Sequence, residues 1–185
     1  MQTAAIMLVF SLADDELFTD SFRVEEVEDG FILKVHAKMI EKKGESIDAS
    51  AFGGNPSAEE EEEALEDPGL EKGLDIVIYH KLKDESAGFP KKKDLQGYLK
   101  LYMKNLIKHL ETAEASKDKI ETIKKDLSAN IKKFTDLMED DSSVYFSENF
   151  DASEFKCAPI IGKWDESGMG VTMYFIKCLV TEEKA

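Results

Sequence analysis

Hydrophobic and polar positions alternate in the first forty residues in the manner of β-strands. Within 31–36, Phe, Leu and Val occupy the odd positions and two of the three even positions are polar, which predicts a half-buried strand. The Asp-Gly pair at 29–30 is a strong turn signal, so 22–27 and 31–40 are predicted to pair as a hairpin. The short apolar run 6–10 is predicted to be a buried strand.

The pattern changes at about residue 41. From 41 to 73 the chain is rich in Gly, Ser, Pro and Glu, and it includes five consecutive glutamates, Glu59 to Glu63. Adjacent carboxylates repel one another and cannot all be buried, so 41–73 is predicted to be a long, flexible, acidic loop. Strand character returns at 74–79, which is predicted to be a strand.

A helical spacing of three and four residues follows, and 91–140 is predicted to form an antiparallel helical hairpin. Asp118 with Glu121 three residues later resembles a capping box at the start of the second helix. The apolar stripe of the first helix is Leu95, Leu99, Tyr102, Leu106 and Leu110, and that of the second is Ile120, Ile123, Leu127, Ile131, Phe134 and Leu137.

Strand patterns return between 144 and 180. Ile160-Ile161, a turn at 168–170 and the run 171–179 suggest a second hairpin. Strands on both sides of a helical pair predict an α+β fold, with the helices projecting from mainly antiparallel sheets. The whole of 1–185 is expected to be a single domain.

Charge narrows the functional classes. The 185 residues carry a formal net charge of −15, so the chain has no basic excess with which to displace counterions from a nucleic acid. Such a charge favours binding of divalent cations or of the basic surfaces of partner proteins. The apolar N-terminal run is too short for a membrane span and lacks the basic leading region of a signal peptide. A cytoplasmic protein is therefore expected.

The residues that most often carry catalysis or metals are sparse. The two cysteines, Cys157 and Cys178, are far apart and have no zinc-site spacing. His36, His80 and His109 have no Ser or Asp partner at catalytic spacing, and His80 and His109 are expected to be surface or packing residues. We therefore expect no enzyme and no tightly bound cofactor.

Several blocks of the chain resemble one known family. Residues 52–59, Phe-Gly-Gly-Asn-Pro-Ser-Ala-Glu, closely resemble the first signature of the translationally controlled tumour protein family. Residues 15–21, 73–82 and 98–104 are similar to further family blocks in the same order. The second signature is recognisable in 144–150, although Ser147 stands where the family usually has glycine. The chain is identified as a divergent member.

The resemblance implies a fold and several partners. The family fold is a small tent of β-sheets with a projecting helical hairpin, and its members are described as calcium-binding, microtubule-associated proteins of growth control and anti-apoptotic protection. Tubulin, a Ras-like small GTPase and a translation elongation factor are the partners that it implies. Some members are also found outside cells, with histamine-releasing activity, so non-classical secretion is a further expectation.

Particular residues are expected to bind these partners. Glu16 lies in the block that the resemblance implicates in contacting a Ras-like GTPase. The alternative interpretation of this block is a structural turn, with Leu17 and Phe18 packed inward. Asn55 and Ser57 lie in the most diagnostic motif, where a structural turn is the alternative to binding. The hairpin makes the one basic region, through Lys100, Lys104 and Lys108 together with Lys117, Lys119, Lys124, Lys125, Lys132 and Lys133.

Calcium ligands are not identified by spacing, because the twelve-residue loop of an EF-hand is absent. The acidic runs 59–63 and 136–141 are candidates for weak calcium binding, and a solvated acidic surface is the alternative for both.

Three functions are compared. The first is a non-enzymatic, cytosolic, multi-partner binding protein, and the second is an exchange factor or chaperone of a Ras-like GTPase. The third is a sulfoxide reductase, by analogy with related folds, and it would need a cysteine of low pKa.

Overall fold

A seven-stranded antiparallel sheet forms the body of the protein. The computed structural model describes residues 5–9, 15–43 and 70–184. The strands of the large sheet follow the order β3-β4-β9-β8-β7-β6, and β5 pairs with the far end of β4. They are β3 (Arg23–Val27), β4 (Ile32–Lys43), β5 (Leu70–Leu74), β6 (Lys83–Asp84), β7 (Ser143–Phe146), β8 (Ile160–Trp164) and β9 (Gly170–Ile176).

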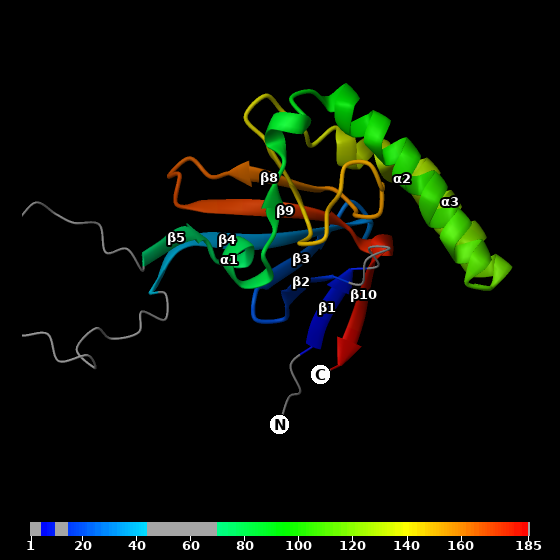
Figure 1. Ribbon diagram of the computed structural model, residues 1–185, viewed down its shortest axis with the longest axis horizontal. Helices are drawn as coiled ribbons and strands as arrows, with labels where there is room; N and C mark the ends of the chain where they lie inside the picture. The colour runs from blue at the N-terminus through cyan, green and yellow to red at the C-terminus, as the bar shows by residue number, and fades with distance from the viewer. Residues whose placement is uncertain (1–4, 10–14, 44–69, 185) are drawn as a thin grey trace, which may run out of the picture.

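A second, three-stranded sheet lies beneath the first in Figure 1. It has the order β10-β1-β2, so the first and last strands of the chain pair with each other. These strands are β1 (Ala5–Val9), β2 (Glu16–Thr19) and β10 (Val180–Lys184). A strand is therefore confirmed over 6–9 of the predicted 6–10, and residue 10 lies outside the described residues.

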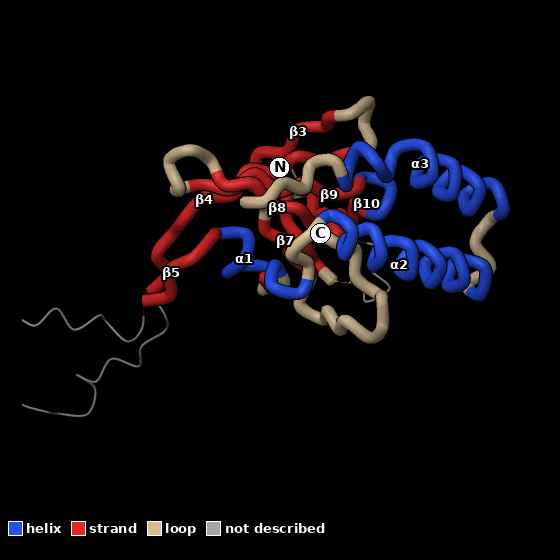
Figure 2. The backbone as a smooth tube through the Cα atoms, turned by 90° about the horizontal axis from the view of Figure 1, so that it is seen from above, coloured by secondary structure: helices blue, strands red, loops and turns tan. Residues whose placement is uncertain are grey.

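Two long helices project from the sheets. Helices α2 (Lys92–Thr112) and α3 (Lys117–Thr135) run side by side at one end of the molecule (Figures 1 and 2). The β4–β5 ribbon extends from the opposite end in both views. The α+β fold with a projecting helical hairpin, predicted from the sequence, is confirmed.

The large sheet has a hydrophobic core on each face, because neighbouring residues of a strand point to opposite sides. Ile32, Val144 and Ile161 pack with the helices α2 and α3. Leu33 and Tyr145, their neighbours in sequence, pack on the other side with β2 and the helix α1 (Asp75–His80). Short 3₁₀ turns at Ser86–Gly88 and Lys177–Leu179 complete the described structure.

The hairpin predicted around the Asp-Gly turn is confirmed. Strands β3 and β4 pair in register from Arg23↔His36 to Val27↔Ile32. Between them Glu28, Asp29 and Gly30 all have positive φ, a conformation that Gly adopts without strain and that Asp adopts more readily than most other residues.

The strand predicted at 74–79 is wrong, because β5 ends at Leu74 and 75–80 is helical. The Asp75 carboxylate accepts hydrogen bonds from the backbone N–H groups of Ile76 (2.8 Å) and Lys38 (3.0 Å), which fixes the start of α1 beside β4. Ile76 is fully buried in the second core. Tertiary packing therefore overrides the strand preference of these β-branched residues.

The loop predicted at 41–73 is too long at both ends. Residues 41–43 belong to β4 and 70–73 to β5, and the two strands pair up to Lys43↔Leu70. This pairing satisfies backbone groups that a solvated loop would expose to water. The glutamate run 59–63 lies outside the described residues.

The capping box predicted at Asp118 is also wrong. Ser116 is the N-cap of α3, and its hydroxyl accepts a hydrogen bond from the backbone N–H of Lys119 at 3.3 Å. Asp118 lies within the first turn of the helix. Serine satisfies an N–H group that would otherwise have no partner.

Candidate partner-binding surfaces

Three segments that are distant in sequence meet around Glu16. Glu16 begins β2, His80 ends α1, and Glu148 follows β7. Together they line a small surface pocket of about 200 Å³, with Asp15, Tyr79 and Lys81 as the other lining residues. We call these six residues the Glu16 pocket.

Glu16 interacts with His80. The Glu16 carboxylate lies 3.2 Å from Nδ1 of His80, and the side chains are 47% and 6% exposed, respectively. The ring of Phe22 lies 5.7 Å from the imidazole, centroid to centroid. Burial lowers the pKa of His80, although the Glu16 carboxylate opposes this shift. His80 is a packing residue that holds an exposed carboxylate in place.

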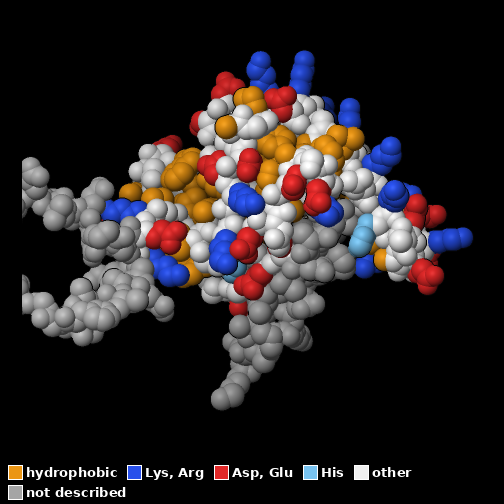
Figure 3. All heavy atoms as spheres, in the orientation of Figure 1, with side chains coloured by type: hydrophobic (Ala, Val, Ile, Leu, Met, Phe, Trp, Pro, Cys, Tyr) orange, Lys and Arg blue, Asp and Glu red, His pale blue; other side chains and the backbone are white. Residues whose placement is uncertain are grey.

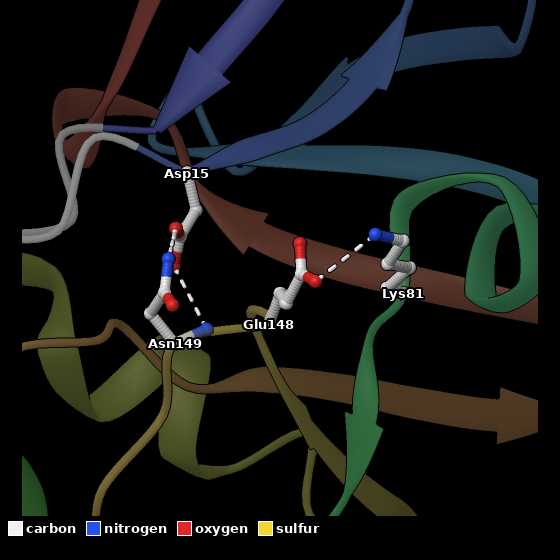
Figure 4. A network of polar contacts seen from close by, with 4 residues as sticks. All are labelled: Asp15, Lys81, Glu148 and Asn149. Atoms are coloured by element: carbon white, nitrogen blue, oxygen red, sulfur yellow. Dashed lines mark hydrogen bonds and ion pairs between the residues drawn. The ribbon is translucent and has the colours of Figure 1, made fainter.

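Two further contacts join the rim of the pocket to the segment after β7 (Figure 4). The Lys81 ammonium pairs with the Glu148 carboxylate at 3.1 Å, and both side chains are exposed. The Asp15 carboxylate accepts hydrogen bonds from the backbone N–H and the side-chain amide of Asn149. Asp15 is itself buried, so its contacts hold the start of β2 against this segment.

The Glu16 pocket therefore presents both negative and positive side chains to solvent, and buried neighbours hold them in place. Glu16, Lys81 and Glu148 are exposed, whereas their supports His80 and Asp15 are covered. Such an arrangement suits a charged protein partner, because exposed charges on ordered backbones lose little freedom on binding.

The helical hairpin carries the second surface. Lys100, Lys104 and Lys108 are all exposed and follow one another at steps of four along α2, so they form one row on the helix. Residues 92–135 contain eleven lysines and six carboxylates. The hairpin is therefore positive within a chain of charge −15, and Figure 3 shows basic side chains gathered over it.

Two carboxylates of the acidic run 136–141 form ion pairs with lysines. Asp136 forms an ion pair with Lys92, and Glu139 with Lys163 at 2.9 Å. The hydrogen bond from Lys92 lowers the pKa of Asp136. Within the described residues no three His, Cys, Asp or Glu side chains gather as metal ligands. Weak calcium binding stays a prediction.

The cysteines lack the character that a reductase needs. Burial raises the pKa of the Cys157 thiol, and it raises the pKa of Cys178 to about 12. Both thiols are free. A nucleophilic cysteine requires a lowered pKa, so neither environment favours sulfoxide chemistry.

The structure brings together only some of the residues singled out from the sequence. Glu16 lies in the pocket and the three lysines lie on α2, whereas Asn55 and Ser57 fall outside the described residues. Sequence reasoning missed His80, Lys81, Glu148 and Asn149 as neighbours of Glu16. The sequence did contain one signal that could have found them, because all four residues lie in blocks that resemble the family. His80 and Lys81 lie in the 73–82 block, and Glu148 and Asn149 lie in the second signature at 144–150.

Comparison with known proteins supports the resemblance. The sequence profile of the family "Translationally controlled tumour protein" matches residues 7–180. A translationally controlled tumor protein homolog of Lonomia obliqua is 32% identical over 177 residues, covering 94% of this chain and 95% of the relative. A homolog of Xenopus laevis is 35% identical over 122 residues, covering 66% and 68%.

Solved structures agree with the sequence comparison. The translationally controlled tumor-associated protein of Schizosaccharomyces pombe superposes with a TM-score of 0.64 at 26% identity, covering 98% of this chain and 99% of that one. The Caenorhabditis elegans protein gives 0.56 at 27% identity, with 98% of each chain covered. No helix among the described residues is long and apolar enough to cross a membrane.

Proposed function

Because the chain belongs to the translationally controlled tumour protein family, we propose that it is a non-catalytic binding protein that docks acidic partner surfaces on its helical hairpin. Tubulin is the partner that the family resemblance implies. The observation that carries the proposal is the exposed row of Lys100, Lys104 and Lys108 on α2. Within the described residues none of these three ammonium groups is paired with a carboxylate.

Electrostatics supports docking at this place on the molecule. The remainder of the chain is strongly acidic and repels an acidic partner, whereas the hairpin attracts it. Complementary charge of this kind sets orientation and association rate more than it sets affinity. A partner is therefore expected to approach the hairpin end first.

Cosedimentation with polymerised tubulin tests the proposal. The test variant replaces Lys100, Lys104 and Lys108 with Gln, and a matched control replaces the exposed Lys38, Lys42 and Lys72 of β4 and β5 with Gln. Both variants change the net charge by the same amount, so an effect of total charge would be equal in the two. We expect the α2 variant to bind at least about tenfold more weakly than the control. Equal binding by the two variants would reject the hairpin as the docking surface.

A second candidate function is regulation of a Ras-like small GTPase through the Glu16 pocket. The supporting observation is that an exposed carboxylate, Glu16, is held in place by His80 beside the Lys81–Glu148 pair. A carboxylate can compete for the magnesium or lysine that holds nucleotide phosphates.

Nucleotide release tests this second function. Release of fluorescent GDP from a Ras-like GTPase is measured with wild type, Glu16→Gln and the control Glu166→Gln on the exposed β8–β9 turn. Faster release that is lost only in Glu16→Gln would support exchange activity. Binding to the nucleotide-free GTPase without acceleration would support a chaperone role, and neither effect at saturating protein would remove the candidate.

A further inference from the structure

An open hollow of about 850 Å³ lies on the helical hairpin and has a largely hydrophobic lining. Leu101, Met103 and Ile107 of α2 contribute to it, together with Leu127 of α3 and Phe155 from the segment after β7. We call it the hairpin hollow. Leu101 is 46% exposed, so the hollow presents to solvent an apolar side chain that the described residues cover only in part.

The position of Phe155 is fixed rather than incidental. The side-chain amide of Asn105 on α2 donates a hydrogen bond of 3.0 Å to the backbone carbonyl of Glu154. Phe155 itself has a φ of 49°, an uncommon backbone conformation for an aromatic residue. Its ring packs against Tyr98, with 5.4 Å between the centroids. One end of the hollow is therefore built by contacts that hold this segment to α2.

The polar part of the hairpin hollow is positive. Lys104, Lys108 and Lys124 line it, and Glu111 is the single acidic lining residue. Glu111 already pairs with Lys124 at 3.5 Å. Lys104 and Lys108 have no carboxylate partner among the described residues, so they remain available for the carboxylates of a partner.

The dimensions suit one kind of occupant. The lining residues of α2 run from Leu101 to Glu111, which corresponds to about 15 Å of helix and about three turns of a helix laid alongside it. An amphipathic helix binds such a hollow through apolar residues at i, i+3/i+4 and i+7. Carboxylates beside that stripe would face Lys104 and Lys108.

We infer that the hairpin hollow is a docking site for an acidic amphipathic helix of a partner protein, with Leu101 and Phe155 as its apolar contacts and Lys104 and Lys108 as its charged ones. This inference rests on the proposed function and deepens it. Docking by charge alone requires only the lysines, whereas insertion of a helix also requires the apolar lining.

Fluorescence anisotropy with the full-length protein tests the inference. The probe is a labelled eighteen-residue peptide with leucines on one helical face and glutamates on either side of that face. One control peptide has the same composition in scrambled order, and a second replaces every glutamate with lysine. We expect the designed helix to bind at least about tenfold more tightly than either control. Equal binding of all three would overturn the inference.

Two single variants separate the apolar contact from a general surface effect. Leu101→Ser removes an exposed side chain of the hollow, and Met169→Ser removes an even more exposed one from the distant β8–β9 turn. Because both sites are solvent-accessible, the fold should tolerate both changes. We expect Leu101→Ser to weaken peptide binding about fivefold or more and Met169→Ser to change it less than about twofold. The same effect from both would contradict a role for the hollow.

Tubulin binding by Leu101→Ser distinguishes failure of the inference from failure of the proposed function. If tubulin binds and depends on the α2 lysines but not on Leu101, and the peptide does not bind, the hairpin docks by charge and the inference fails. Absence of both tubulin and peptide binding would reject the inference and the proposed function together. Self-association that disappears in Leu101→Ser, without peptide binding, would assign the hollow to a second copy of the chain and overturn the inference.

Discussion

Gly162 shows how tightly the sheet packs at the level of one residue. A Cβ atom at this position would lie 2.7 Å from the Tyr145 ring and 3.1 Å from Val171, and both side chains are buried. We therefore expect Gly162→Ala to lower the free energy of unfolding by about 1–3 kcal/mol, because the neighbours must shift.

Urea denaturation measures this effect, and Gly97 in α2 provides the matched control. Nothing lies within 4 Å of a Cβ added at Gly97, and alanine favours the helix over glycine by about 1 kcal/mol. Gly97→Ala should therefore stabilise the protein. Stabilisation by Gly162→Ala as well would show that the β7–β8–β9 packing is looser than described.

His80 makes the stability depend on pH. Its pKa in the folded protein is lowered, chiefly by burial, whereas in the unfolded chain it stays near the ordinary value of about 6.5. The unfolded chain therefore binds more protons between these two pKa values. The stability that neutral His80 contributes is complete above about pH 6.5 and is lost as the pH falls through the folded pKa.

Thermal unfolding of wild type and His80→Gln between pH 7.5 and 5 measures this contribution. We expect the variant to lose less stability than wild type over this range, with His109→Gln, an exposed position, as the control. If His80→Gln loses as much stability as the wild type between pH 7.5 and 5, the group responsible for the pH dependence is not His80.

Ser116 decides where the second long helix begins. Its hydroxyl caps the N–H of Lys119, so Ser116→Ala should lower the free energy of unfolding by about 1 kcal/mol. Asp118→Ala is the matched control, because Asp118 affects only the charge of the first turn, which contributes about 0.3–1 kcal/mol. Chemical denaturation compares the two. A larger loss from Asp118→Ala would support the cap predicted from the sequence.

The elements that the sequence predicted well are those with strong local signals. The turn at 28–30 and the two helical stripes are local patterns, and β3, β4, α2 and α3 follow them within a few residues. The local pattern gave the wrong element at 75–80. Three consecutive β-branched residues at 76–78 indicate a strand, but burial of Ile76 and the contact of Asp75 with Lys38 favour a helix. Such a contact across 37 residues leaves no local signal.

The Glu16 pocket illustrates the same limit for function. Glu16 could be singled out from the family resemblance, but its packing against His80 could not, because the two are 64 positions apart in the sequence. The convergence of 15–21, 73–82 and 144–150 appears only when β2, α1 and β7 are placed in the fold.

At the scale of the whole molecule, the helical hairpin carries the opposite charge to the rest of the chain. The helical hairpin is positive and projects from one end, whereas the chain as a whole has a net charge of −15. The central claim is that acidic partners bind at this end, with tubulin as the first partner to examine. Charge separation of this kind orients an approaching partner before contact.

Lysine footprinting tests this claim most directly. The protein, alone and with saturating polymerised tubulin, is treated briefly with an acetylating reagent, and the modification of each lysine is read by mass spectrometry. We predict that Lys100, Lys104 and Lys108 are protected by tubulin, while Lys38, Lys42 and Lys72 of β4 and β5 react as before. Protection of the β4 and β5 lysines with unchanged reactivity along α2 would contradict the account.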